Sequence, residues 1–204
     1  MTLLLSEDQR DALQEVSNIA MGQAGDSLAR LLGVFVKLSV PRIHVVEAGA
    51  VGGMLMETLG VDAPVTAIRQ AFHGALRGEA VALYPDEGRG DIGDLLGYDA
   101  DPALERQEEL LLDVTNLLIG ASVSGISGML GRDAAFQPPT LVACGARVSR
   151  LLDGTETPWQ CALLVQVHFS VAERGFTCHL IHFMPDTSVD ALRHALDGFM
   201  ATLA

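Results

Sequence analysis

The chain has 204 residues, of which 49% are hydrophobic and 19% are charged. These values are typical of an ordinary globular protein, and the length suits one well-packed domain or two small ones. The formal net charge of −13 argues against nucleic acid or an anionic membrane surface as a partner, because both need Lys and Arg side chains to neutralise phosphates. A partner with a basic rim is favoured instead.

Signals of a membrane or secreted protein are not evident in the sequence. No apolar run reaches the roughly 18 residues of a membrane span, and the first residues form neither a basic region nor a small-residue cleavage site. We therefore expect a cytoplasmic protein. The cysteines Cys144, Cys161 and Cys178 are far apart and odd in number, which fits neither a disulfide framework nor clustered metal ligands. Reduced thiols in the core are expected.

The first predicted element is a helix over residues 7–32. Ser6 and Gln9 have the spacing of a capping box, and Gly33 is placed to end the helix in a left-handed conformation. Apolar residues recur at helical spacing between these ends. They are Leu13, Val16, Ala20, Ala24, Leu28 and Leu31.

A second stripe of this helix is polar. Asp11, Glu15 and Asn18 are spaced i, i+4, i+7, so they project together, away from most of the apolar face, and Gly22 continues the stripe by one turn. A carboxylate and an amide followed by glycine leave space for another protein to approach closely. The alternative is a solvated helix face whose glycine serves helix packing.

Strands are predicted after this helix at residues 34–46, 65–76 and 79–84, followed by a short acidic helix at 87–97. A second long helix follows, capped by Asp101 with Pro102 at its first position, and Gly131 ends it. Its apolar stripe runs through Leu110, Val114 and Leu117. Further strands are predicted at 140–148, 157–171 and 175–183, and a last helix at 187–204.

The two halves of the chain repeat each other. Four residues of the first half have identical counterparts 98 positions later: Asn18 and Asn116, Gly22 and Gly120, Gly33 and Gly131, Pro41 and Pro139. A Pro-Asp pair at the end of each half recurs at an offset of 100. The sequence therefore predicts one α/β (α+β) domain of two units, 6–97 and 101–204, related by approximate two-fold symmetry. Two long helices would pack with a six-stranded, mostly antiparallel sheet.

The repeat includes the polar stripe, which recurs as Glu109, Asp113, Asn116 and Gly120. Asparagine in the middle of a helix is less favourable than alanine by roughly 0.5–0.7 kcal/mol. Helix stability therefore does not explain why both helices carry it at the same place. This favours a functional stripe over a solvated face.

These residues resemble a known signature. Asp11-x3-Glu15-x2-Asn18, followed after 22 residues by Pro41, is similar to the Asp/Ser-x3-Glu-x2-Asn-x22-Pro pattern of the CheC, CheX and FliY phosphatases. The second copy, ending in Asn116 and Pro139, keeps the amide, the proline and the spacing but departs at both acidic positions. Two motif copies in one chain resemble CheC more than dimeric CheX.

The resemblance implies a substrate, the phosphorylated aspartate of a response regulator such as CheY, which holds its own Mg²⁺; the chain itself would need no cofactor. Asn18 would orient the attacking water, and Glu15 would pair with a lysine of the regulator. Asp113 and Asn116 would form a second site, weaker because aspartate is one methylene shorter than glutamate. Their stripe neighbours Asp11, Gly22, Glu109 and Gly120 would contact the partner.

The sequence supports other chemistries and roles less well. No catalytic triad is evident, and His168, His179 and His182 make a poor metal site because the last two would face opposite sides of one strand. One alternative function is a non-catalytic adapter that binds a phosphorylated regulator or CheD. Another is a structural protein related to the flagellar switch, whose middle domain shares the fold; such proteins usually have further domains, for which 204 residues leave no room.

Overall fold

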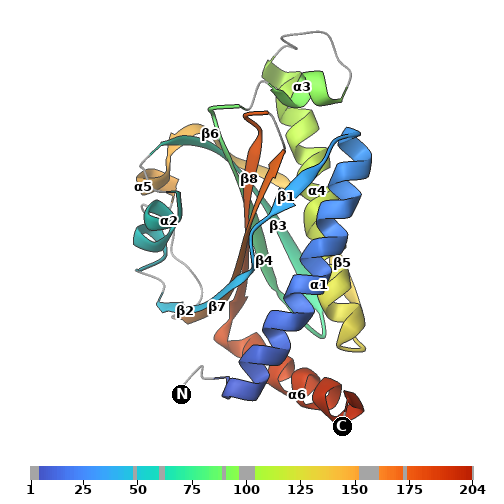
Figure 1. Ribbon diagram of the computed structural model, residues 1–204. Coiled ribbons are helices and arrows are strands. Elements are labelled where there is room, and N and C mark those ends of the chain that lie inside the picture. The colour runs from blue at the N-terminus through green and yellow to red at the C-terminus, as the bar shows by residue number, and fades with distance from the viewer. Residues whose placement is uncertain are drawn as a thin grey trace.

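A computed structural model of the chain (Figure 1) describes residues 5–47, 50–59, 63–88, 91–96, 104–151, 161–171 and 174–203. The first half holds α1 (Glu7–Leu32), β1 (Val36–Leu38), β2 (Arg42–Glu47), α2 (Val51–Leu59), β3 (Pro64–Gly74), β4 (Gly78–Pro85) and α3 (Asp91–Leu95). The second half holds α4 (Leu104–Met129), β5 (Ala134–Phe136), β6 (Thr140–Arg147), α5 (Val148–Leu151), β7 (Cys161–Val171), β8 (Thr177–Pro185) and α6 (Asp186–Leu203).

Helix α1 begins and ends where its sequence predicts. The Ser6 side chain accepts a hydrogen bond from the Gln9 amide, and the Gln9 side chain accepts one from the Ser6 amide, so the capping box is formed. Gly33 has φ of 66°, the left-handed conformation that glycine adopts without a steric penalty. Gly131 follows α4 in the same way, with φ of 64°. The predicted cap at residues 101–102 lies outside the described residues.

The strands form one antiparallel sheet, but their predicted number was wrong. The described residues hold eight strands, in the order β1-β7-β8-β4-β3-β5, with β2 also pairing with β7 and β6 with β3. The predicted strand 34–46 is divided into β1 and β2, because Pro41 has no amide hydrogen to continue a ladder. Pro138 and Pro139 separate β5 from β6 in the same way.

Two short helices were not predicted. Helices α2 and α5 lie together on the face of the sheet opposite α1 and α4 (Figure 1). Along β7, Leu163, Val165 and Val167 belong to the core under α1 and α4, while Leu164 belongs to the smaller core under α2 and α5. The sheet is therefore covered on both faces, and α1 and α4 form the larger layer.

The strand registers repeat between the two halves. Leu38 of β1 pairs with Phe169 of β7. Phe136 of β5 lies 98 residues after Leu38, and it pairs with Phe72 of β3, which lies 97 residues before Phe169. The residue offsets seen in the sequence are therefore also found in the strand pairing.

The same relation holds where the two halves meet, between β4 and β8. Ala80 pairs with His182, and Ala82 pairs with Leu180. Adding 100 to the first residue of each pair gives the second residue of the other pair. The two central strands are thus exchanged by the repeat, as expected if the two-fold axis passes between them.

Helix α4 contains one stretch, Arg106–Met129, that is long and apolar enough to cross a membrane by length and composition alone. This corrects the expectation that no segment would reach that length. A buried core helix passes the same test, and Leu111, Val114 and Leu118 of α4 are completely buried. The stretch is therefore weak evidence for a membrane span.

The thiols and histidines lie partly in the core. Cys178 is buried, and burial raises the pKa of its thiol to about 12. Cys144 is exposed, so the expectation of core thiols was wrong for this residue, which lies on β6 at the edge of the sheet. His168 and His179 stack with ring centroids 4.4 Å apart. His182 lies on the other face of β8, where its Nε2 is 3.0 Å from Ser122 Oγ.

The buried histidine His182 makes the fold acid-sensitive. Burial lowers its pKa to about 4, and a backbone hydrogen bond with Val165 acts in the opposite direction with a smaller effect. In the unfolded chain the imidazole of His182 is protonated below about pH 6.5. In the folded chain it stays neutral until the pH falls to about 4. The stability associated with His182 is therefore present above pH 6.5 and lost as the pH falls towards 4, by on the order of 3 kcal/mol.

We predict that His182→Gln flattens the fall in unfolding free energy between pH 6.5 and 4, measured by urea denaturation. His73→Gln is the matched control, because His73 lies exposed at the end of β3, and it should leave the pH profile unchanged. Identical profiles for His182→Gln and the parent chain would contradict this account.

Candidate functional site

The polar stripe of α1 faces outward. Asp11, Glu15 and Asn18 are all exposed, whereas Leu13 and Val16 on the opposite side are completely buried. Within the described residues, the side chains of Glu15 and Asn18 have no hydrogen-bond or ion-pair partner. Both groups are therefore available to another molecule.

The glycine in this stripe is not required by packing within the chain. A Cβ atom added at Gly22, or at Gly120 of α4, would meet no atom within 4 Å. The helix contact uses a different glycine: a Cβ at Gly125 would lie 2.9 Å from the Cβ of Ala20. The open space over Gly22 therefore favours approach by a partner over the alternative of a helix-packing glycine.

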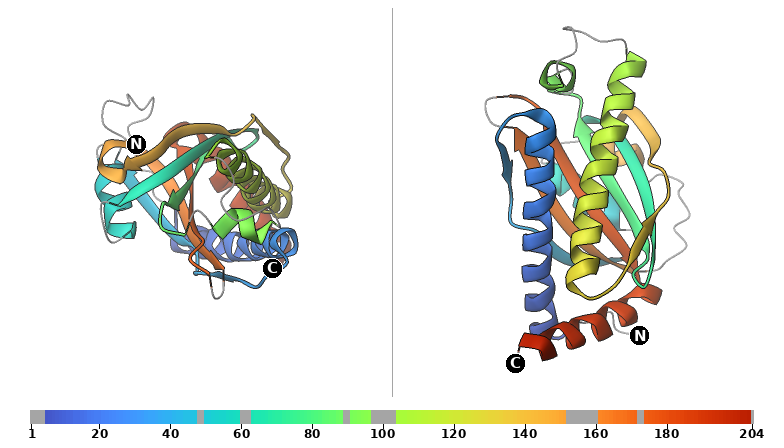
Figure 2. Two further views of the ribbon diagram at one scale, coloured as in Figure 1. Left: turned by 90° about the horizontal axis from the view of Figure 1, so that it is seen from above. Right: turned by 90° about the vertical axis from the view of Figure 1, so that its right-hand side faces the viewer.

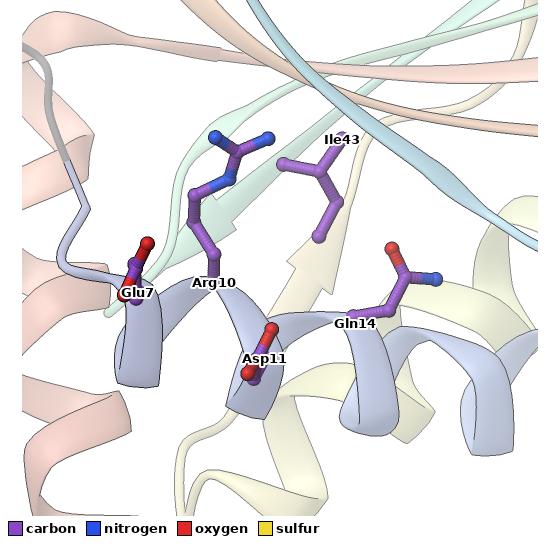
Figure 3. A pocket seen from close by; sticks show the side chains of 5 residues that line it. All are labelled: Glu7, Arg10, Asp11, Gln14 and Ile43. Atoms are coloured by element: carbon purple, nitrogen blue, oxygen red, sulfur yellow. The ribbon is translucent and has the colours of Figure 1, made fainter.

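Asp11 lies at the rim of a hollow between the first turns of α1 and strand β2. The cavity measures about 520 Å³ and is lined by Glu7, Arg10, Asp11, Gln14 and Ile43 (Figure 3). Gln14 Nε2 donates a 2.7 Å hydrogen bond to the carbonyl oxygen of Pro41, the proline of the motif. Pro41 thus fixes the loop before β2 against α1, which agrees with a structural role.

The second stripe, on α4, is similarly placed but has internal partners. Glu109, Asp113 and Asn116 are exposed, and Gly120 is half-buried. Arg106 Nη1 lies 3.2 Å from Glu109 Oε2. The Asn116 side-chain oxygen accepts a 2.8 Å hydrogen bond from Gln70 Nε2. The two asparagines, equivalent in sequence, therefore differ in their surroundings.

The two stripes lie far apart on the molecule. Helices α1 and α4 lie side by side and run in opposite directions, as the colours in Figure 2 show. Ala20 of α1 lies opposite Gly125 of α4. Asn116 is nine residues before Gly125, so in antiparallel helices it lies opposite Ala29, nine residues after Ala20 and 11 residues from Asn18. At 1.5 Å per residue this separates the asparagines by about 16 Å along the helix axis. Each stripe is therefore a separate candidate site.

Gln70 and Gln14 did not emerge from the sequence pattern. Gln70 is one of several polar residues in the predicted strand 65–76, and Gln14 lies next to the motif residue Glu15. Both signals are weak without a structure, because the bonds that they make join segments 46 and 27 residues apart. In the described part of the chain, no three His, Cys, Asp or Glu residues are grouped to hold a metal ion.

Known sequences match this chain around the first stripe. The CheC-like family matches residues 9–45, which hold the α1 stripe and Pro41. The flagellar motor switch phosphatase FliY of Bacillus subtilis (strain 168) is 24% identical over 172 residues, covering 82% of this chain and 43% of that relative. The chain thus spans less than half the length of this curated relative.

Solved structures share the fold. Thermotoga maritima FliY has a TM-score of 0.71 at 16% identity, covering 96% of this chain and 99% of that one. A chain of the FliG–FliM complex from H. pylori has 0.63 at 12%, covering 93% and 100%. A chain of the CheX–CheY–BeF3–Mg²⁺ complex from Borrelia burgdorferi has 0.53 at 12%, covering 81% and 95%. At these identities the likeness shows the fold alone, a curled antiparallel sheet with helices.

The space over Gly22 gives a prediction that separates folding from partner contact. Gly22→Ala should stabilise the chain by roughly 0.5–1 kcal/mol, because alanine is the better helix former and its Cβ meets nothing. The same methyl should weaken binding of a protein that packs on the stripe. Thermal unfolding and binding measurements would check both effects.

Gly128→Ala is the matched control, because Gly128 of α4, like Gly22 of α1, is a helical glycine with open space around it, and it lies off both stripes. It should not change partner binding. If Gly22→Ala binds the partner as tightly as the parent chain, close approach at Gly22 is excluded.

Proposed function

Because the family match, the FliY relative and the shared fold support the CheC/CheX/FliY family for this chain, we propose that it is a response-regulator phosphatase. Its substrate is the aspartyl phosphate of a CheY-like regulator. The observation that carries the proposal is the α1 stripe: Glu15 and Asn18 are exposed and unpartnered, and Gly22 leaves open space beside them. This stripe lies within the segment that matches the family.

The reaction needs little covalent chemistry from the protein. The oxygen of a water molecule bonds to phosphorus, the bond from phosphorus to the aspartyl oxygen breaks, the aspartate leaves as a carboxylate, and a water proton passes to the phosphate product. Phosphoryl transfer of this kind depends mainly on positioning and charge placement. A helix that inserts one well-placed group beside the phosphoryl aspartate is therefore sufficient.

Asn18 supplies that group. A side-chain amide is not a base, but its oxygen can accept a hydrogen bond from the attacking water and hold it in line with the phosphorus. The exposed Asn18 side chain makes no competing hydrogen bond with the described residues. In the same stripe, one turn before Asn18, Glu15 is placed to form an ion pair with a lysine of the regulator and to anchor the helix.

The regulator contributes the rest of the site. One chain of the CheX–CheY–BeF3–Mg²⁺ complex shares the fold of this chain, and that complex contains CheY and Mg²⁺. In our proposal the metal therefore belongs to the partner. The net charge of −13 suits a partner surface with a basic rim. Action on a response regulator places the protein in the cytoplasm, and binding to CheD stays a prediction.

A second function is favoured by the FliM neighbours. FliM shares this fold and is found in complexes with FliG and with SpeE, so the fold also serves protein binding. A non-catalytic adapter would use the same stripe to hold a phosphorylated regulator. The rate of phosphate release distinguishes the two functions. Only a phosphatase makes a phosphorylated regulator release inorganic phosphate faster than it does alone.

We predict that Asn18→Ala lowers the rate at the first site by about 10²-fold, as the loss of one positioning group does in other enzymes. The rate is measured as loss of labelled phosphate from purified phosphorylated regulators of the source genome. Asp190→Ala, on the exposed surface of α6, is the control and should keep the parent rate. Equal rates for the parent chain and the Asn18→Ala/Asn116→Ala double variant would exclude catalysis by either stripe.

The two sites should be unequal. Asn116→Ala should reduce total phosphate release less than Asn18→Ala, because Asp113 reaches one methylene less than Glu15 and Asn116 is already bonded to Gln70. The single variants are compared under saturating regulator. A larger loss for Asn116→Ala would reverse the ranking.

A further inference from the structure

Gln70 connects the sheet to the second stripe. It lies on β3, beneath α4, and is 1% exposed. Its Nε2 donates two hydrogen bonds, one of 2.8 Å to the Asn116 side-chain oxygen and one of 2.9 Å to the Gln137 carbonyl oxygen. A buried side chain thus holds an exposed residue of the candidate site.

The second bond settles which way the amides face. A carbonyl oxygen can only accept, so the atom of Gln70 that faces Gln137 must be its NH₂ group. The same NH₂ group faces Asn116, which therefore turns its oxygen inward and leaves its own NH₂ group as the free end. The remaining oxygen of Gln70 is buried without a hydrogen-bond partner in the described residues.

The first stripe has no such contact. The residue 97 positions after Gln70, at the equivalent point of β7, is Val167, which is 1% exposed and apolar. Valine can neither donate to nor accept from Asn18. The difference between the two stripes is thus a difference between one buried glutamine and one buried valine.

A neighbouring contact differs in the same direction. Thr115 precedes Asn116 on α4, and its Oγ1 lies 2.7 Å from Oη of Tyr84 on β4. The counterpart of Thr115, 98 positions earlier, is Ser17, whose buried hydroxyl has no hydrogen-bond partner among the described residues. The counterpart of Tyr84, 100 positions later, is the apolar Met184. Helix α4 is therefore bonded to the sheet next to its asparagine, whereas α1 rests there on apolar side chains.

Stability does not account for Gln70. Its buried, unpartnered oxygen costs free energy, and replacing such a group by an apolar residue is often neutral or stabilising. Asn116 is exposed, so water could satisfy its oxygen if Gln70 were absent. Gln70 therefore carries a cost to the fold, which points to an effect on Asn116.

We propose that Gln70 is a positioning residue that holds the Asn116 oxygen against the sheet and keeps the second stripe from orienting water. This inference rests on the proposed phosphatase function and adds a structural reason for unequal sites. Water attack needs an acceptor directed at the partner, and Asn116 presents a donor there. Loss of Gln70 should therefore activate the second stripe.

The test measures the second stripe by itself, in the Asn18→Ala background. Gln70→Val, which copies the first site, should raise phosphate release from a phosphorylated regulator by about tenfold, as release of one net hydrogen bond would. Gln70→Met keeps the length of glutamine without its donors, and it should raise the rate similarly. A gain in rate cannot result from misfolding.

The reciprocal change tests the first stripe. In the Asn116→Ala background, Val167→Gln should lower phosphate release, while thermal unfolding reports whether the variant stays folded. The side-chain amide of Asn116, followed by NMR without any regulator, should become more mobile in Gln70→Val. That readout depends on the hydrogen bond alone.

The outcomes separate the inference from the function on which it rests. If the Asn18→Ala/Asn116→Ala variant matches the parent chain in rate, the phosphatase proposal fails. If that variant is inactive but Gln70→Val and Gln70→Met leave or lower the second-site rate, only the role of Gln70 is overturned. A gain with Gln70→Val but not with Gln70→Met would trace the effect to side-chain volume and would also overturn it.

Discussion

The close contact between α1 and α4 determines which faces of the two helices are buried and which are exposed. Gly125 lets the two helices approach at Ala20, since a Cβ there would lie 2.9 Å from the alanine methyl. Two antiparallel helices held this closely cover one face of the sheet and bury one side each. Their opposite sides, with Asn18 on one helix and Asn116 on the other, are left to solvent. The candidate sites are thus a consequence of how the helices pack.

The same packing permits the two halves to diverge. Helices α1 and α4 each pack on strands from both halves of the chain. The asparagine of each helix therefore faces a strand residue from the other half. Val167 and Gln70 occupy these equivalent positions. A single buried substitution can therefore change one site and leave the other intact. A repeated fold does not require two equally active sites.

Much of this arrangement could be predicted from the sequence because it depends on local patterns. The capping box at Ser6, the glycine at position 33 and the i, i+4, i+7 spacing of Asp11, Glu15 and Asn18 specify a helix and its outward face, as found. The eight-strand count, helix α2 and the Gln70 bond could not be predicted. The strand count depends on where Pro41 interrupts the hydrogen bonding between strands. The Gln70 bond depends on contacts between distant segments, which the spacing of apolar residues along the chain does not indicate.

In the proposed function, the α1 stripe approaches the phosphoryl site of a regulator. The most direct measurement is an NMR titration with a regulator activated by BeF3 and Mg²⁺, which mimic its phosphorylated state. We expect strong chemical-shift changes at the Asn18 side-chain amide and the Gly22 backbone amide, and weaker changes at Asn116. Shifts confined to other surfaces, such as α6 or the edge strand β6, with Asn18 unchanged, would contradict it.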